Sequence, residues 1–333
     1  MIKKCYGWIL LGALALLVGC GKKSEAGGEA HFAFLTTGVA GFWDIAKKGA
    51  EDAGKELGVK VDVLMPSSGA DQKQKIEDLL ARGVDGMAVA AIDPANQTSL
   101  FNEVAKRAIF ITADTDAPEA DRRVYIGMDN YAAGWMVGDL LREALPEGGD
   151  IALFVGRMEQ DNARRRRQGI IDNLLEREKD RDRYDETGQI LAGGKFRILA
   201  TLTDQFDRNR GKTQVEDMMT KHPDIAAMVG LFEYNPAIII EALKQADKLG
   251  EIKVVGFDEN EMVLQGIKDG HVHGTVVQNP YEYGKRSMEV LKALSEGDDS
   301  VIPENKFIDI PARTIRQDNV DEFWADLKAK MAR

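Results

Sequence analysis

Four carboxylates follow four apolar runs of the sequence, each at the point where the run stops. They are Asp93, Asp114, Glu233 and Asp258, after GMAVAAI, AIFITA, IAAMVGLF and KVVGF. Unalternating apolar runs are typical of strands that are buried on both faces of a parallel sheet. Such sheets bind ligands beyond the carboxyl ends of their strands. The carboxylates are therefore candidates for accepting hydrogen bonds from ligand hydroxyl groups.

Acidic residues also follow strands as N-caps of the next helix. This alternative is strongest for Asp93, which precedes a proline and a helical pattern. It explains less well why acids stand at matched ends of two similar series. One series runs from GVDGMAVAAIDP to AIFITADTD, and the other from PDIAAMVGLFEYNP to IKVVGFDEN. The two series predict one structural unit that is used twice.

Strand and helix patterns alternate from His31 to the end of the chain. Apolar runs predict strands at 31–37, 59–65, 86–92, 108–114, 150–156, 196–202, 225–232, 251–257 and 271–278, with short extended pieces at 124–129, 306–310 and 313–315. The charged stretch 176–187 predicts a solvated helix end or an insertion loop. The alternation is typical of parallel βαβ units with right-handed crossovers. We expect an α/β fold, and 333 residues suggest two domains.

Composition and motifs exclude several classes of function. The formal net charge is −11, and nucleic-acid binding needs clustered Lys and Arg, so no nucleic-acid partner is expected. The sequence contains no Walker A, GxSxG or HExxH motif, so we expect no enzyme. His271 and His273 share a strand face, but no third ligand accompanies them. We therefore expect neither a metal site nor a cofactor.

The N-terminus has the pattern of an export signal. Lys3 and Lys4 precede an apolar run from Gly7 to Val18, which is too short to span a bilayer comfortably. The run closes on Leu-Val-Gly-Cys and resembles a bacterial lipobox, with Cys20 as the lipid-modified residue; an ordinary cleaved signal is the alternative. Residues 1–20 are thus a predicted signal peptide and 21–30 a flexible tether. We expect a periplasmic or cell-surface protein anchored to a bacterial membrane.

Seven motifs follow one another along the chain: Phe42-Trp43, ITAD, NARRRRQG, FDRNRG, HPDIAAM, VVGFDEN and TVVQNPYEYG. In this order they resemble the periplasmic sugar-binding proteins of the ribose-binding type, and the resemblance runs from about His31 to about Ile315. It implies a periplasmic binding protein-like I fold, with two doubly wound Rossmann-like lobes joined by a three-strand hinge. It also implies a ligand trapped between the lobes and delivered to an ABC permease and its ATPase.

The resemblance implies lobe boundaries as well. The N-terminal lobe would comprise 31–129 and 279–310, and the C-terminal lobe 130–278 and 311–333. The chain would cross near Met128-Asp129, Gln278-Asn279 and Asp309-Ile310. We expect a monomer that closes around its ligand by hinge motion.

Carried over by motif, several residues acquire roles in sugar binding. Phe42 and Trp43 correspond to aromatic rings that flank the sugar, whose C–H bonds pack on aromatic faces. Asp114 and Asp258 correspond to hydroxyl acceptors, and Arg166 to a bidentate donor. The rest of the four-arginine run is expected to be mostly a solvated helix face. The predicted ligand-binding set is Phe42, Trp43, Asp114, Thr115, Asp116, Arg166, Phe206, Phe232, Glu233, Asn235, Asp258 and Gln278.

Three positions depart from the ribose pattern. Ala40 stands where asparagine is expected, Thr115 where arginine is expected, and Phe232-Glu233 where Asn-Asp is expected. Tyr234 and Asn235 could take over part of the last role. An unpaired buried polar group costs about 1–3 kcal/mol, so we expect a monosaccharide or polyol other than ribose. A non-sugar signalling molecule or cationic compound, an exported enzyme and a repressor effector domain are the alternatives.

Overall fold

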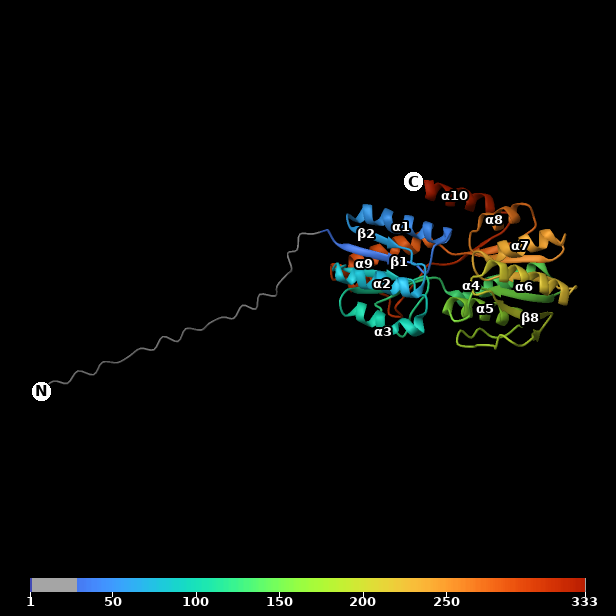
Figure 1. The fold of residues 1–333 in the computed structure, drawn as a ribbon, viewed down its shortest axis with the longest axis horizontal. Helices are drawn as coiled ribbons and strands as arrows, with labels where there is room; N and C mark the ends of the chain where they lie inside the picture. The colour runs from blue at the N-terminus through green and yellow to red at the C-terminus, as the bar shows by residue number, and fades with distance from the viewer. Residues whose placement is uncertain (2–28, 333) are drawn as a thin grey trace.

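The computed structural model describes Met1 and residues 29–332, and Figure 1 shows their arrangement. The predicted signal peptide, Cys20 and nearly all of the predicted tether lie outside the described residues. Among the helices that the structure describes, none combines the length and the apolar character that crossing a membrane requires.

The first lobe is built on a six-stranded parallel sheet with the order β12-β5-β4-β3-β1-β2. Helices α1 and α9 cover one face, where Phe32 and Phe34 are buried, and α2 and α3 cover the other, where Ala33 and Leu35 are buried. The elements are β1 (His31–Leu35), α1 (Gly41–Leu57), β2 (Lys60–Leu64), α2 (Gly69–Ala81), β3 (Gly86–Val89), α3 (Pro94–Ala105), β4 (Ile109–Ala113), β5 (Tyr125–Gly127), α9 (Pro280–Ser295), η1 (Asp299–Val301) and β12 (Phe307–Asp309).

The second lobe is built on a seven-stranded sheet with the order β13-β11-β10-β9-β6-β8-β7. Its helices α4 and α5 cover one face, and α6, α7, α8 and α10 cover the other. The elements are α4 (Asn130–Ala144), β6 (Gly149–Val155), α5 (Asp161–Leu174), β7 (Leu191–Gly193), β8 (Phe196–Thr203), α6 (Arg208–Lys221), β9 (Ala227–Gly230), α7 (Asn235–Gln245), β10 (Lys253–Phe257), α8 (Glu261–Lys268), β11 (Gly274–Val277), β13 (Arg313–Ile315) and α10 (Val320–Ala332).

The strand orders show that the second lobe repeats the first. Strands β8, β6, β9, β10, β11 and β13 occupy the places of β2, β1, β3, β4, β5 and β12. The predicted repeat is thus confirmed. The second sheet is not wholly parallel, because its two edge strands, β7 and β13, run antiparallel to their neighbours. Short antiparallel edge strands of this kind are common on otherwise parallel sheets.

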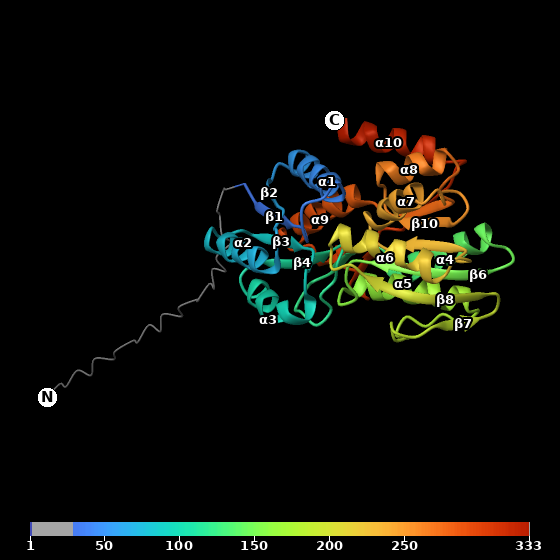
Figure 2. The ribbon, with the colours of Figure 1, turned by 45° about the vertical axis from the view of Figure 1, so that its right-hand side comes forward.

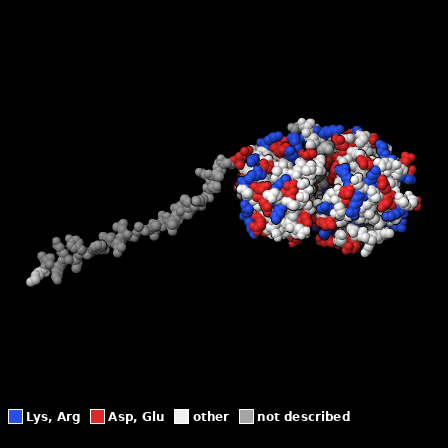
Figure 3. Space-filling model, viewed as in Figure 1, with Lys and Arg blue, Asp and Glu red and all other residues white. Residues whose placement is uncertain are grey.

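Within residues 29–332 the chain passes between the two sheets three times, after β5, after β11 and between β12 and β13. Figures 1 and 2 show the two lobes side by side, with α10 lying along one side of the molecule from α8 toward the first lobe. On the face in Figure 3 the basic and acidic side chains are interspersed over both lobes. The described residues therefore form no continuous basic surface on that face.

Glycines let one helix pair in each lobe approach to backbone contact. A Cβ atom on Gly49 of α1 would lie 1.9 Å from the carbonyl oxygen of Tyr281, and one on Gly284 of α9 would lie 1.9 Å from that of Ala46. In the second lobe, a Cβ on Gly134 of α4 or Gly169 of α5 would lie 2.1 Å from a carbonyl oxygen of the partner helix. Only a residue without a side chain permits such contact. The pairs α1–α9 and α4–α5 are therefore equivalent seams.

The charged stretch after α5 is an ordered loop. The carboxylate of Asp172 is fully buried and accepts hydrogen bonds from the Tyr131 hydroxyl, at 2.8 Å, and from Gln168 Nε2, at 3.0 Å. Arg183 in the loop pairs with the same carboxylate at 2.7 Å, and Arg181 pairs with Asp129 at the first crossing between the lobes. One buried acid in α5 thus organises the loop over the helix.

Candidate functional site

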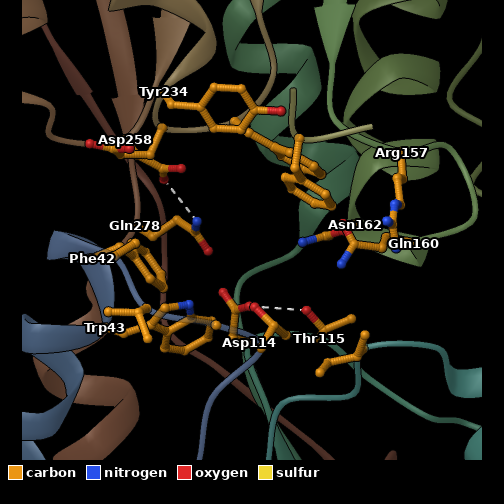
Figure 4. A pocket seen from close by; sticks show the side chains of 18 of the residues that line it. Phe42, Trp43, Asp114, Thr115, Arg157, Gln160, Asn162, Tyr234, Asp258 and Gln278 are labelled. Atoms are coloured by element: carbon orange, nitrogen blue, oxygen red, sulfur yellow. Dashed lines mark hydrogen bonds between the residues drawn. The ribbon is translucent and has the colours of Figure 1, made fainter. Parts of the chain in front are cut away.

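A cleft of about 540 Å³ lies between the lobes, beyond the carboxyl ends of both sets of parallel strands. Figure 4 shows side chains from both lobes pointing into it. Ten of the predicted ligand-binding residues line the cleft: Phe42, Trp43, Asp114, Thr115, Arg166, Phe206, Phe232, Glu233, Asp258 and Gln278. The fold thus brings together residues that are up to 236 positions apart in the sequence (278 − 42). Their contact with a ligand stays a prediction.

Two residues of the predicted set do not line the cleft. The Asp116 carboxylate accepts hydrogen bonds from Thr112 Oγ1 and Arg122 Nη2, both at 2.6 Å, and so faces its own lobe. Asn235 is buried; its Nδ2 donates to Asp204 at 2.9 Å and its Oδ1 accepts from the Phe232 backbone N–H at 3.1 Å. Asn235 therefore supports the cleft wall from behind.

Asp114 and Asp258 occupy equivalent positions at the ends of β4 and β10. Both have a left-handed backbone, with φ of 62° and 68°. Each backbone N–H donates to the neighbouring strand at 2.9 Å, to Ile126 and Val276 respectively. Each backbone carbonyl accepts a hydroxyl hydrogen bond, from Tyr125 in one lobe and from a threonine in the other. These bonds hold a conformation that costs about 1–3 kcal/mol, and such strain concentrates at functional sites.

Burial raises the pKa of Asp114 and of Asp258 to about 6. The Arg166 guanidinium opposes this rise in the pKa of both groups, and a hydrogen bond opposes it in each: from Thr115 to Asp114 and from Gln278 to Asp258. The negative charge of Asp258 further raises the pKa of Asp114. The two carboxyls are thus nearly dry hydrogen-bonding groups with one cation beside them.

Arg166 is buried near the strand-end aspartates of both lobes, Asp114 and Asp258. Its Nε donates to Asn130 Oδ1 and its Nη1 to the Leu231 carbonyl, both at 2.9 Å, while Nη1 lies 3.9 Å from Asp258 Oδ2. The guanidinium carbon stands 4.6 Å from the centre of the Phe257 ring. Stacking and hydrogen bonds together fix the plane of the guanidinium.

The expectation that the remaining arginines of the run form a solvated face is wrong for Arg167. This side chain is 1% exposed, and it donates to Thr201 Oγ1 at 2.7 Å and to the Asp185 carbonyl at 2.5 Å. The reason is the loop after α5, which covers a helix face that periodicity alone would leave in water. Arg164 is exposed, as expected.

Aromatic rings line both sides of the cleft. In the first lobe, Phe42 and Trp43 pack edge to face, with ring centres 4.9 Å apart. In the second lobe, Phe206 stacks on Phe232 at 5.9 Å with an interplanar angle of 8°, and it lies 6.0 Å from Tyr234. Rings on both lobes suit a ligand that presents apolar faces.

One buried carboxylate outside the predicted set holds the second lobe's rings. Asp204 accepts hydrogen bonds from the Tyr234 hydroxyl at 2.6 Å, the Phe206 backbone N–H at 2.8 Å and Asn235 Nδ2 at 2.9 Å. Burial raises its pKa, and these bonds oppose the rise. Asn235 also accepts a hydrogen bond from the Phe232 backbone N–H, and so it links Asp204 to Phe232. Asp204 directly follows an apolar strand, so the strand-end pattern used for the other acids could have found it.

The four strand-end acids differ in their roles. Asp93 does not line the cleft; its carboxylate accepts from the Asn96 backbone N–H at 3.3 Å and so caps α3, as the alternative explanation held. Glu233 does line the cleft, and its Oε1 accepts from Asn260 Nδ2 at 2.7 Å.

A chain of hydrogen bonds crosses from one lobe to the other at the back of the cleft. The Tyr283 hydroxyl of α9 bonds to Gln278 Oε1 at 3.1 Å, and Gln278 Nε2 donates to Asp258 Oδ1 at 2.8 Å. Gln278 lies on the second crossing between the lobes. Asp258 of the second lobe is thus linked through Gln278 to helix α9 of the first lobe.

Other cleft residues were missed by sequence reasoning because they lie in loops or first helical turns without a distinctive pattern. They are Thr37, Gly38, Val39, Ser67, Ser68, Gly69, Ile92, Arg157, Gln160, Asn162 and Arg208. Their positions after β1, β2, β3, β6 and β8 follow the strand-end rule, but that rule does not say which loop residues turn inward. In residues 29–332, no group of three or more His, Cys, Asp or Glu side chains could hold a metal ion.

Residues 32–299 match the family model described as a periplasmic binding protein domain. The chain belongs to this family. Among its relatives, the ribose import binding protein of Bacillus subtilis strain 168 is 27% identical over 89% of this chain and 94% of its own length. An ABC transporter solute-binding protein from Burkholderia graminis C4D1M, solved with D-arabinose, is 27% identical with a TM-score of 0.78, over 87% of this chain and 96% of that one.

A third member supports the fold alone. The solute-binding protein from Agrobacterium vitis, bound to α-D-tagatopyranose, has a TM-score of 0.79 at 21% identity and covers 90% of this chain and 99% of that chain. The resemblance drawn from the sequence motifs and the predicted two-lobe α/β fold class are both confirmed. The Bacillus and Burkholderia relatives are themselves named as binding proteins.

Proposed function

We propose that the protein is an extracytoplasmic receptor that binds a monosaccharide or closely related polyol between its lobes and delivers it to an ABC permease. One observation carries this proposal: Asp114 and Asp258, equivalent carboxylates of two repeated lobes, line the same cleft together with aromatic rings from both lobes. Relatives named for ribose import and solved with D-arabinose support the same class of ligand.

The chemistry of the cleft suits a polyhydroxylated ring. Carboxylates accept charge-assisted hydrogen bonds from hydroxyl groups, which are stronger than neutral ones. Arg166 and the Gln278 amide supply donors for ring and hydroxyl oxygens. Phe42 and Trp43 on one side, and the rings beside Phe206 on the other, match the C–H faces of a sugar.

Binding would proceed by hinge closure. A ligand that contacts both lobes stabilises the closed form relative to the open one, by as much as its affinities for the two forms differ. The lobes proposed are 31–129 with 279–310, and 130–278 with 311–333. Rotation about the three crossings would then open the cleft for release to the permease. We also propose a lipid anchor at Cys20 and a monomeric receptor.

A thermal-shift and calorimetric screen of purified mature protein tests the proposal. The panel contains neutral monosaccharides, polyols, sugar acids, sugar phosphates, amino sugars and polyamines. We expect a carbohydrate or polyol to raise the melting temperature, and we expect NMR to recover it chemically unchanged after incubation. If only polyamines bind, or if the ligand is converted, the proposal is wrong.

Neighbouring aspartates of the first lobe provide a matched pair of variants. Asp114→Asn removes a carboxylate that lines the cleft, and we expect it to weaken binding at least tenfold, about 1.4 kcal/mol. Asp116→Asn alters a carboxylate two positions away that faces Arg122 instead. Equal affinity of the wild type and Asp114→Asn would contradict the assignment of the cleft.

A further inference from the structure

One end of the cleft carries hydrogen-bond donors for which the protein supplies no acceptor. The groups are Arg157, Gln160 and Asn162 at the β6–α5 junction and Arg208 at the start of α6. Within the part of the chain that the structure describes, neither Arg157 nor Arg208 forms an ion pair, although thirty such pairs occur elsewhere. Among the described arginines that form no ion pair, these two are the ones that line the cleft.

Both arginine side chains are exposed, and each guanidinium lies over an aromatic ring. The Arg157 guanidinium carbon lies 5.2 Å from the centre of the Phe206 ring, and that of Arg208 lies 5.5 Å from the centre of the Tyr234 ring. Both rings are held by the buried Asp204. A guanidinium that stacks through its face keeps its in-plane N–H groups available to a ligand. The donors are therefore positioned in advance.

The start of α5 adds donors at the same end. Gln160 is 7% exposed, its side-chain amide bonds to no other described group, and it does not cap the helix. Helix α4 of the same lobe, by contrast, is capped by Asp129. A helix start without an N-cap side chain presents N–H groups and a partial positive charge, and both favour an anion. In α5 the Ala163 N–H is taken by Asn162 Oδ1, and the Asp161 carboxylate of the first turn is paired with Arg165, which leaves the N–H groups of Asp161 and Asn162. Here this adds to the arginines and to the buried amide.

Each carboxylate of the cleft accepts one hydrogen bond from a neighbouring side chain and keeps further acceptor capacity. Asp258 accepts from Gln278, and Glu233 accepts from Asn260. Figure 4 places Arg157, Gln160 and Asn162 across the cleft from Asp258 and Gln278. The cleft thus has an acceptor end that suits hydroxyl groups and a donor end that suits an acceptor-rich group. A volume of about 540 Å³ has room for a sugar ring and a substituent.

We propose that the ligand is a sugar that bears an anionic substituent, a carboxylate or a phosphate, and that Arg157, Arg208 and the start of α5 bind this substituent. The inference rests on the proposed function and narrows it to acidic sugars. The ring would lie toward Asp114 and Asp258, and its charged group would point toward the β6–α5 junction.

Isothermal titration calorimetry with matched ligands tests the inference on the mature protein. The sets are galactose, galacturonate and galactose 6-phosphate; glucose, glucuronate and glucose 6-phosphate; and ribose and ribose 5-phosphate. We expect one anionic member to bind at least tenfold more tightly than its neutral parent. Whether the uronate or the phosphate does so identifies the substituent.

Arginine variants separate this effect from general binding. We expect Arg157→Gln and Arg208→Gln each to reduce the affinity ratio of the anionic ligand to its parent at least fivefold. Arg164→Gln is the matched control, because Arg164 lies on the outer side of α5 with its guanidinium 5.5 Å from the Tyr184 ring centre. We expect that variant to keep the wild-type ratio.

The possible outcomes distinguish the two proposals. If neutral sugars bind as tightly as their anionic counterparts, or if the arginine variants keep the wild-type ratio, the inference is overturned while the sugar-receptor function stands. If no carbohydrate of either kind binds, the proposed function itself fails.

Discussion

The first lobe contributes a single charged side chain to the cleft, Asp114, whereas the second contributes three arginines and two carboxylates among the residues that the structure describes. Yet the two lobes share one strand order and place their aspartates identically, at the ends of β4 and β10. The scaffold therefore fixes where a cleft residue can stand, and the loops decide its chemistry. The first lobe supplies two adjacent aromatic rings, and the second supplies most of the charged side chains of the cleft.

The aromatic rings illustrate the same difference. Phe42 and Trp43 lie in the first turn of α1 and need no special backbone. Phe206 lies in a loop with φ of 64°, is 46% exposed, and depends on the Asp204 carboxylate for its position. The first wall is thus built by a helix, and the second by a polar network. A polar network at the surface can be altered with less disturbance of the core than a helix packed on the sheet can.

Removing Arg166 should have the largest effect on both lobes, because this one cation lies near the buried aspartates of each. We expect Arg166→Ala to weaken ligand binding at least tenfold and to lower the free energy of unfolding by about 3 kcal/mol, because buried carboxylates would lose their cation. Calorimetry and urea denaturation measure the two effects. Arg164→Ala, at an exposed position of the same helix, is the control. A variant with wild-type affinity would show that Arg166 is not part of the site.

The two aspartates should differ in how they couple stability to pH. Each has a folded-state pKa near 6, above the ordinary value of 3.8, so the folded form binds more protons. Stability from each group is therefore lost as pH rises from about 4 to 6, by up to about 3 kcal/mol, and stays constant above. We expect Asp114→Asn and Asp258→Asn to remove part of this loss, which urea denaturation between pH 4 and 7.5 would measure against the wild type.

The second of these variants should have the larger effect. Asp258 precedes Glu259, whose carboxyl is buried without a hydrogen-bond partner among the described residues and whose pKa is raised by burial and by Asp258. Asp114 precedes Thr115, which donates to it instead. Asp258→Asn thus removes one buried carboxyl and the charge that raises the pKa of a second, Glu259, whereas Asp114→Asn removes one buried carboxyl only. Equal pH profiles of the two variants would show that the lobes are electrostatically equivalent.

The glycine seams should respond alike in the two lobes. Gly284→Ala and Gly134→Ala each place a methyl group about 2 Å from a carbonyl oxygen of the partner helix, at 1.9 Å and 2.1 Å. We expect each to lower the free energy of unfolding by about 1–3 kcal/mol through overpacking. Gly188→Ala, with no atom within 4 Å of the added carbon, is the control. A large cost in one lobe alone would mean that the seams are not equivalent.

Much of this organisation is readable from the sequence. Apolar runs and their spacing predicted the strands, and the matched series predicted the repeat, because a buried parallel strand must be apolar along its whole length. The carboxylates at strand ends pointed to the cleft for the same reason. The cap role of Asp93 was also foreseeable, since a proline and a helix follow it.

The rest depended on contacts between distant segments. Asp204 acquires its role only when the loop after β8 lies beside the loop after β9, an adjacency that no local pattern encodes. Arg167 is buried because a charged loop folds back over α5 around Asp172. Arg157 and Gln160 reach the cleft from the turn between β6 and α5, whose conformation no local pattern specifies. Periodicity gives the faces of an element, but the partner that covers each face comes from the tertiary structure.

The reciprocal glycines have a mechanical consequence. Helices α9 and α4 begin just after two of the crossings, where Asn279 and Asp129 cap them. Each is joined at backbone contact to a helix whose uncapped start faces the cleft, α1 or α5. Under the proposed hinge closure, each pair would move as one rigid unit about the neighbouring crossing. If the lobes close as proposed, a dye attached at Ser295, the exposed end of α9, would move with this pair and report occupancy of the cleft, which makes the protein a natural scaffold for an optical biosensor.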